Sequence, residues 1–193
     1  TYRARLVVGE WSSEVPFEVL ADPRSSATQE DLEAQFDFVL GVRDRLTEIH
    51  EAIAGLRRAR GDLEALETRV GKDDAKDGED AAHPELAAAV STLLADLDSI
   101  EKALYQTQNQ SPQDPLNFPV RLNDKLGALL RLASIGENRP TDSMVQVRDQ
   151  LEAAVNEQLN RLSDLWRDRL PEINRLAREA EIPAVRPPAP PED

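Results

Sequence analysis

The 193-residue sequence contains no cysteine, few aromatic residues and no long apolar run. Without cysteine the chain has neither disulfide bonds nor thiolate chemistry. No apolar run approaches the roughly 20 residues that a membrane-spanning helix needs, so we expect no membrane insertion. The sequence has instead many aliphatic and charged residues at helical spacing.

Basic residues are also scarce relative to acidic ones. The chain has 23 Lys and Arg residues against 37 Asp and Glu residues, which gives a formal net charge of −14 at pH 7. A charge of this sign repels the phosphates of nucleic acids and of anionic lipids. We therefore expect neither nucleic acid nor a membrane surface among the partners.

The first twenty residues alternate between apolar and polar side chains, as strands do. Residues 2–8 and 15–20 carry this alternation, and the turn-forming segment 9–13 lies between them. A hairpin of two strands is marginally stable in water, so it either packs on the helices that follow or belongs to a larger β-sandwich. We favour the second interpretation, in which residues 1–22 are the tail of a truncated sandwich domain and the chain is a C-terminal fragment of a longer protein.

Apolar residues recur at steps of three and four after residue 26, which is typical of amphipathic helices. The first such segment can start from the hydroxyl of Ser26 or Thr28 and reaches about Val70. The second opens with Pro84, since proline is favoured in the first helical turn, and forms a regular heptad seam. The apolar positions of the two segments are Leu32, Phe36, Val39, Leu46, Ile49, Ile53, Leu56, Leu63 and Val70, and then Leu86, Val90, Leu93, Leu97, Ile100 and Leu104.

Two further helices are expected in the second half of the chain. A short third helix carries the apolar residues Leu122, Leu126, Leu129, Leu130 and Ala133, and a long fourth helix begins near Thr141 and ends near Ala180. Pro171 is expected to kink the fourth helix, because proline removes a backbone donor and crowds the preceding turn.

Four helices joined by short connections predict a mainly α fold, an up-down-up-down four-helix bundle over residues 27–181. Two helices are long and two are short, so half of each long helix would meet only the other long helix. The exposed apolar seams of these two long helices could also pair between copies of the chain, so a homo-oligomer is an alternative. The polar segment 71–82 is expected to be a mobile loop, and residues 182–193 an extended Pro-rich tail.

The candidates for chemistry are incomplete. His50 and Glu51 begin a zinc-protease pattern, but the second ligand would fall on Ala54. The acidic segment 73–78 resembles a calcium loop, yet an alanine replaces one oxygen ligand and the bidentate glutamate is missing. We therefore expect no catalytic residue, no metal and no cofactor in this chain.

The segment 105–123 differs from the rest because its unusual residues cluster without helical periodicity. Asp114 and Pro115 predict a turn, and Asn117 is expected to cap a third helix that starts at Phe118. The segment is either a rigid turn between helices or a polar recognition loop. Its candidate residues are Tyr105, Gln106, Asn109, Ser111, Asp114, Asn117, Phe118, Arg121 and Asn123.

Residues 105–126 also suggest a family. Their Gln-Asn-Gln-Ser, Asp-Pro-Leu-Asn-Phe-Pro and Arg-Leu-Asn-Asp-Lys-Leu pieces resemble the C-terminal helical region of large bacterial sortilin-like, sialidase-type β-propeller proteins with BNR repeats, often labelled glycosyl hydrolases. The pieces Thr-Tyr-Arg-Ala-Arg-Leu-Val-Val and Pro-Phe-Glu-Val-Leu-Ala-Asp-Pro-Arg resemble the last hairpin of the Ig-like sandwich domain that precedes that region. The resemblance places any sugar chemistry in the propeller, so no catalytic residue carries over to this sequence.

The expected function is that of a non-catalytic C-terminal helical packing and interaction module in a secreted or periplasmic bacterial propeller protein. Its expected partners are the upstream β-propeller and sandwich domains of the same protein. The alternative is an accessory part of a glycoside hydrolase whose catalytic residues lie in the missing propeller. A substrate-binding module ranks last, because it needs exposed aromatic residues and the few present fall mostly on predicted core faces.

Overall fold

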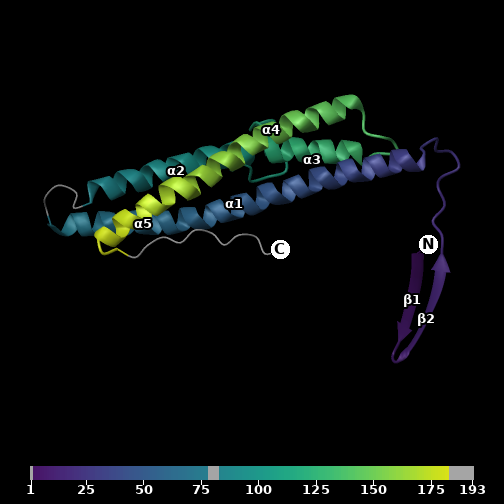
Figure 1. Cartoon of the computed structure of the whole chain (residues 1–193), viewed down its shortest axis with the longest axis horizontal. Coiled ribbons are helices and arrows are strands. Elements are labelled where there is room, and N and C mark those ends of the chain that lie inside the picture. The colour runs from purple at the N-terminus through teal and green to yellow at the C-terminus, as the bar shows by residue number, and fades with distance from the viewer. Residues whose placement is uncertain (1, 78–82, 183–193) are drawn as a thin grey trace.

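The computed structural model describes residues 2–77 and 83–182, with the side chains of all of these except 71–77. The fold is mainly helical with a two-stranded hairpin at its start, as the sequence predicts. Figure 1 shows a long helical bundle and a hairpin that stands apart from it. The end of the expected loop, at 78–82, and the Pro-rich tail from residue 183 lie outside the described residues.

The hairpin consists of the strands β1 (Tyr2–Val8) and β2 (Trp11–Phe17). The second strand therefore begins earlier than the expected residue 15 and ends before residue 20, because Val8 already pairs with Trp11 and the turn is shorter than the expected 9–13. The four expected helices are present. The first three are α1 (Gln29–Asp77), α2 (Pro84–Leu104) and α3 (Leu122–Ala133), and the fourth begins as α4 (Asp142–Asp164). A π-helical turn, η2 (Leu165–Arg169), joins α4 to α5 (Leu170–Glu179), and a 3-10 turn, η1 (Asp114–Leu116), lies between α2 and α3. The first part of the expected mobile loop is helical, since α1 continues to Asp77. None of the described helices is both long and apolar enough to cross a membrane.

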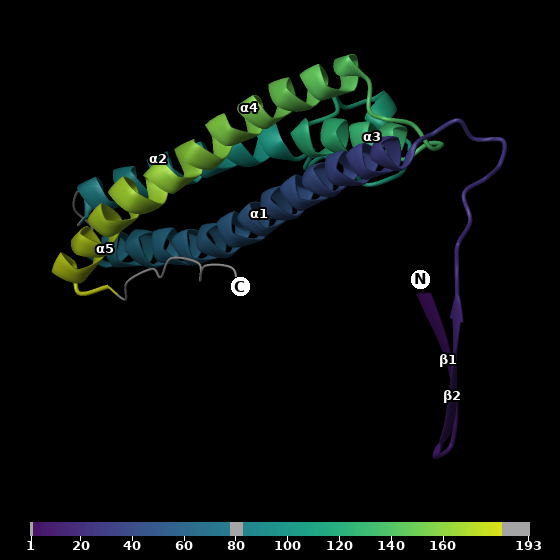
Figure 2. The same ribbon diagram turned by 45° about the vertical axis from the view of Figure 1, so that its right-hand side comes forward.

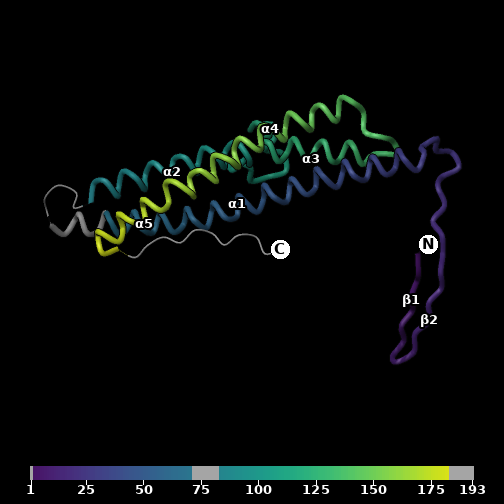
Figure 3. Tube along the Cα trace, in the orientation of Figure 1, coloured from purple at the N-terminus to yellow at the C-terminus, as the bar shows by residue number. Residues whose placement is uncertain are grey.

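The helices α2 and α3 both run antiparallel to α1, one after the other. Arg57 in the middle of α1 lies 2.6 Å from Glu101 near the end of α2. Gln35 near the start of α1 donates a hydrogen bond of 2.7 Å to the carbonyl of Ala133 at the end of α3. Later residues of α2 and α3 thus meet earlier residues of α1, so the chain keeps one direction from α2 into α3 (Figure 3).

The helix α4 returns parallel to α1. Arg139, just before α4, lies 3.0 Å from Asp31 at the start of α1, and Arg45 donates a hydrogen bond to Asn156 in α4. The chain therefore passes along the bundle three times, as α1, then α2 with α3, then α4 with α5 (Figure 2). This order corrects the expected up-down-up-down path, in which α3 would reverse the direction of α2.

The three-pass order covers α1 on both halves. α2 packs on the C-terminal half of α1 and α3 on its N-terminal half, while α4 packs on all three of these helices and α5 packs on α2. The two short helices thus share one long partner instead of lying beside each other. In the described part of the chain, the expected half-length pair of long helices is replaced by a three-helix cross-section.

The core is one apolar seam at the centre of the three passes. All predicted seam positions of α2 are buried, and so are those of α1 from Ile49 to Val70. At the start of α1, however, Phe36 is 63 % exposed, and Phe38 and Val42 lie in the core instead. Steps of three and four fit two adjacent stripes of a helix, and the side on which α3 and α4 pack selects one of them.

The start of α1 is fixed by Thr28, one of the two predicted capping residues. The Thr28 hydroxyl accepts a 3.2 Å hydrogen bond from the Asp31 amide, while the Asp31 carboxylate accepts one from the Thr28 amide at 3.0 Å and one from its hydroxyl at 2.6 Å. This is a reciprocal capping box. Arg139 also donates to Asp31, at 3.0 Å. These hydrogen bonds, the one from the Thr28 hydroxyl foremost, lower the pKa of Asp31 to about 2.

The fourth helix is interrupted beside the predicted proline. The Leu170 amide donates to the carbonyl of Leu165, five residues back, which is the bonding of a π-helix. Pro171 occupies the first turn of α5, where a missing amide hydrogen leaves no acceptor unpaired within α5. The proline therefore changes the hydrogen bonding of the preceding turn, and the helix continues to Glu179.

Leu97→Ala is expected to lower the free energy of unfolding by about 2–5 kcal/mol, because it empties a fully buried position of the α2 seam. Urea unfolding followed by circular dichroism measures the change. The control is Leu132→Ala on α3, where the side chain is 52 % exposed, and the expected change is below about 0.5 kcal/mol. Equal effects of the two substitutions would contradict the position of Leu97 in the core.

Stability is expected to fall in acid partly through Asp31. Its folded pKa of about 2 lies below the roughly 3.9 of an unfolded aspartate. Its ionised form therefore stabilises the fold above that unfolded value, and this contribution is lost as the pH falls toward 2. Asp31→Asn should reduce the loss of stability on acidification, whereas Asp37→Asn, on an exposed carboxylate of the same helix, should not. Denaturation across the acid range tests this, and an NMR titration giving Asp31 an ordinary pKa would contradict it.

Candidate functional site

The junction loop, residues 105–121, joins α2 to α3 beside the middle of α1. α2 ends where the Tyr105 amide donates a 2.7 Å hydrogen bond to the Glu101 carbonyl. The backbone of Tyr105 is extended, with φ −139° and ψ 143°. The chain thus leaves the helix in an extended conformation before the 3-10 turn η1 and the start of α3.

Gln106 connects the two ends of the junction loop. Its side chain is 4 % exposed, and its Nε2 donates a 2.9 Å hydrogen bond to the carbonyl of Pro119. Its Oε1 accepts a 3.1 Å hydrogen bond from the amide of Gln108. Because buried amides need partners, this side chain holds the loop in one conformation.

Asp114 organises the middle of the loop. Its carboxylate accepts hydrogen bonds from the amide of Gln110 at 2.5 Å and from the amide of Ser111 at 2.7 Å. The Ser111 hydroxyl donates a third, at 2.9 Å. These donors, the Gln110 amide foremost, lower the pKa of Asp114 below its ordinary value. The predicted turn at this aspartate is therefore present and forms η1.

Asn117 does not cap the third helix, which corrects the prediction. Its own backbone is helical and its amide donates to the Asp114 carbonyl at 2.8 Å, so it closes η1. Arg121 is the residue before α3, and its amide donates to the Asp124 carboxylate at 3.3 Å. The extended backbone of Arg121 delays the helix to Leu122, so Phe118 lies before the helix.

A buried carboxylate with two arginine partners lies at the start of the loop, and sequence analysis did not anticipate it. Glu101 is 1 % exposed and lies 2.6 Å from Arg57 and 2.5 Å from Arg60. The Arg57 guanidinium also lies 5.2 Å from the centroid of the Tyr105 ring. A buried carboxylate requires compensating charge, and two arginines three residues apart on α1 supply it. An acidic residue between Ile100 and Leu104 of the seam was the available signal.

The remaining predicted site residues do not converge on one point. Asn109, Ser111 and Asn117 are exposed, Tyr105, Phe118 and Arg121 are half-buried, and Asn123 is buried in α3. His50 and Glu51 lie exposed on α1. Among the residues with described side chains, no His, Cys, Asp and Glu side chains gather as a metal site would require. The acidic side chains of 73–77 are outside that description, as is residue 78.

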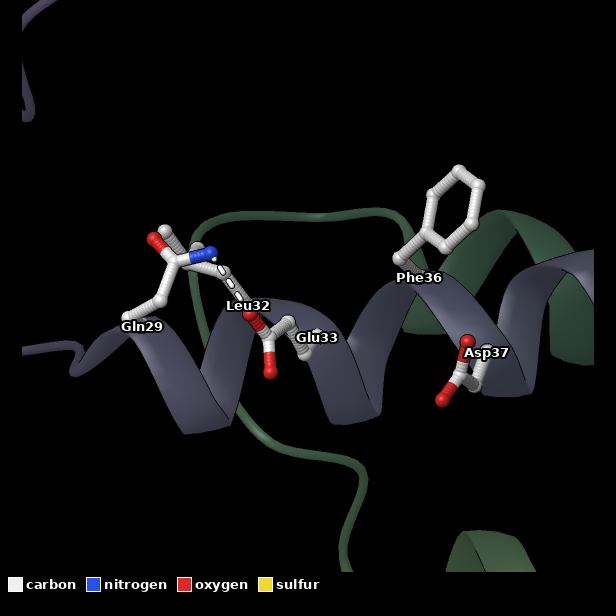
Figure 4. Close-up of a pocket in the computed structure, with 5 residues that line it drawn as sticks. All are labelled: Gln29, Leu32, Glu33, Phe36 and Asp37. Carbon is white, nitrogen blue, oxygen red and sulfur yellow. Dashed lines mark hydrogen bonds between the residues drawn. The ribbon is translucent and has the colours of Figure 1, made fainter.

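A shallow groove on the start of α1 contains the exposed Phe36. Its lining is Gln29, Leu32, Glu33, Phe36 and Asp37, all from one helix (Figure 4). The Gln29 amide group donates a 2.9 Å hydrogen bond to the Glu33 carboxylate. These two polar side chains thus satisfy each other, and the groove is an open helix surface with no converging chemistry.

The hairpin has one apolar and one polar face. Its register pairs Tyr2 with Phe17 and Val8 with Trp11, and paired residues of antiparallel strands point to the same side of the sheet. The side that contains these two pairs is here named the apolar hairpin face. It consists of Tyr2, Ala4, Leu6, Val8, Trp11, Val15 and Phe17, together with Ser13. The opposite face carries Arg3, Arg5, Val7, Ser12, Glu14 and Pro16.

The apolar hairpin face is uncovered. Its large side chains range from 46 % exposed for Phe17 to 63 % for Val8, and the rings of Tyr2 and Phe17 stack at 5.6 Å. The strands contact each other and none of the described helices. Full burial of a large apolar side chain contributes about 1.5–3 kcal/mol, and a patch of this kind marks an interaction surface.

No protein-family model, curated protein or solved structure matches this chain. Its function is therefore inferred from two features, the self-bonded junction loop and the uncovered hairpin face. Internal hydrogen bonds fix the conformation of the loop, and the side-chain amides of Asn109 and Asn117 are exposed to solvent. The hairpin can bury apolar surface against another sheet.

Gln106→Ala is expected to destabilise the fold by about 1–3 kcal/mol, because it leaves the Pro119 carbonyl and the Gln108 amide without their partner. Urea unfolding measures the loss, and hydrogen exchange at Gln108 should quicken. Asn117→Ala is the control from the same loop, and its expected change is within about 0.5 kcal/mol because the side chain is exposed. A larger effect of Asn117→Ala would restore its predicted role as a helix cap.

Proposed function

We propose that this chain is a non-catalytic helical packing and interaction module of a larger protein, which its hairpin joins to a β-rich domain. The uncovered apolar hairpin face, beside a bundle with its own closed core, is the observation that carries this proposal. The proposed parent is a secreted or periplasmic bacterial β-propeller protein of the sortilin-like, sialidase type, whose Ig-like sandwich domain the hairpin completes. The resemblance of residues 105–126 to the helical region of such proteins supports this parent.

The helical part is self-sufficient. Its buried apolar residues form one cluster with members from all five α-helices, and no hairpin residue belongs to it. α1 alone has 49 residues, which is roughly 73 Å of helix at about 1.5 Å per residue. Such a rod suits a spacer or a docking arm that extends from a domain.

The hairpin, in contrast, depends on something else for its stability. Two isolated strands are marginally stable in water, and here both faces of the pair are open to solvent. The apolar face needs a second sheet or a helix layer above it. A β-rich domain of the same protein supplies such a layer without a separate association step.

The charged groups with shifted pKa values have structural partners. The pKa of Asp31 is lowered foremost by Thr28, that of Asp114 by the loop amides, and that of Asp168 by Arg167. These shifts stabilise the ionised form of each acid, so each remains a hydrogen-bond acceptor at neutral pH. A general acid at neutral pH would need the opposite shift. These three carboxylates thus act as local hydrogen-bond acceptors and not as acids at neutral pH.

Hydrogen exchange of the hairpin tests the proposal. The amides that bond across the hairpin, between β1 and β2, should exchange slowly in the full-length parent protein and rapidly in the 193-residue chain, because only the parent covers the apolar hairpin face. The seam of α2 is the internal control, and its exchange should be equal in both. Rapid hairpin exchange in the parent would contradict the docking, and turnover of aryl glycosides or sialosides by the purified chain would contradict the non-catalytic assignment.

A further inference from the structure

The turn of the hairpin determines which backbone groups point outward. Gly9 has φ +60° in the two-residue loop between Val8 and Trp11, as in a type II′ turn. The pair that closes such a loop exchanges both backbone hydrogen bonds. The next pair exchanges none, and the two kinds of pair alternate along the hairpin. The pairs that do not are Val7 with Ser12, Arg5 with Glu14 and Arg3 with Pro16. Their amides and carbonyls point away from the partner strand.

The two outer edges therefore differ. The edge of β1 presents the amides of Arg3, Arg5 and Val7, one at every second residue. The edge of β2 is interrupted, because Pro16 has no amide hydrogen where a neighbouring strand would need one. Proline at an outward position is typical of the last strand of a sheet. Only β1 has a complete edge for a further strand.

The charges beside the β1 edge select the kind of strand. Arg3 and Arg5 both approach Glu14, at 3.4 Å and 3.9 Å, so two cations share one carboxylate. If β1 paired with β1 of a second copy in a register that places Arg5 opposite Arg5 or Arg3, arginines would face arginines, and like charges across strands are unfavourable. Carboxylates at the same positions would be favourable. The edge thus fits an acidic strand better than it fits a copy of itself.

We infer that the outer edge of β1 binds a β-strand that carries carboxylates opposite Arg3 and Arg5. The source of this strand, a β-rich domain of the parent, rests on the proposed function, whereas its edge and its charge follow from the hairpin. The resulting sheet has β1 in the middle and β2 with Pro16 at its border. Alternate apolar residues of the added strand would continue the apolar hairpin face.

The test uses the complete chain and a synthetic strand peptide of about seven residues, the length of β1, with Glu alternating with Val and Tyr. At millimolar peptide, NMR should show slower hydrogen exchange at the amides of Arg3, Arg5 and Val7, with Ser12 and Glu14 unchanged. A peptide with Lys in place of Glu should bind roughly tenfold more weakly, because two cross-strand pairs change from opposite to like charge.

Val7→Pro and Ser12→Pro form a matched pair of variants, since the two residues face each other and their amides leave opposite edges. Each removes one outward amide, as Pro16 already does, and both leave the arginines in place. Val7→Pro should abolish the effect of the Glu peptide, and Ser12→Pro should change its affinity by less than about twofold. Contacts between the rings of Tyr2 and Phe17, seen by NMR, verify the hairpin in each variant.

Four outcomes would overturn the inference: protection at Ser12 and Glu14 instead, equal binding of the Lys peptide, no protection with either peptide, or dimerisation of the chain through β1. They are distinguishable from a failure of the proposed function. That failure appears as fast hairpin exchange in the parent protein, whereas the peptide experiment measures the edge and charge preference of the 193-residue chain alone.

Discussion

The apolar stripe of α1 is the interaction on which the rest of the fold depends. It runs through Val42, Ile49, Leu56 and Leu63. α3 covers its N-terminal half and α2 covers its C-terminal half. A helix of this length exposes more apolar surface than one short partner can bury, so two partners lie head to tail along it. The third pass, α4 with α5, then closes the core over both of them.

The head-to-tail arrangement explains the junction loop. Two helices that share one stripe must be joined by a segment that does not reverse the chain, and this segment interrupts the backbone hydrogen bonding at the middle of the bundle. Gln106 and Asp114 supply partners for the freed backbone groups. Glu101 is neutralised by Arg57 and Arg60 from α1. The polar residues of this region thus stabilise the interruption between α2 and α3. Buried backbone groups and charges without such partners would be destabilising.

The two parts of the chain treat their apolar surface differently. The bundle closes its seam internally, so none of the seam needs the hairpin. The hairpin leaves Leu6 and Trp11 more than half exposed and has nothing of its own to place over them. This contrast supports the proposed function, in which the bundle is a rigid body and the hairpin is its attachment. The arginines of the polar face and Pro16 distinguish the two edges of the hairpin, so a further strand would join at β1 and not at β2.

Local patterns determined much of this structure. Strand alternation predicted that a hairpin is present, the heptad seam from Leu86 to Leu104 predicted the buried face of α2, and a capping hydroxyl at Ser26 or Thr28 predicted the start of α1, because each depends on residues close in sequence. The position of the hairpin turn was not predicted, since the second strand begins at Trp11. The direction of α3 and the exposure of Phe36 were decided by the tertiary structure. An apolar stripe shows that one side of a helix must be buried. Its spacing, however, fits two adjacent faces of the helix and does not determine which other helix packs on it. Likewise, Asn117 had a capping side chain, and only the backbone of the folded loop placed it at the end of η1 instead.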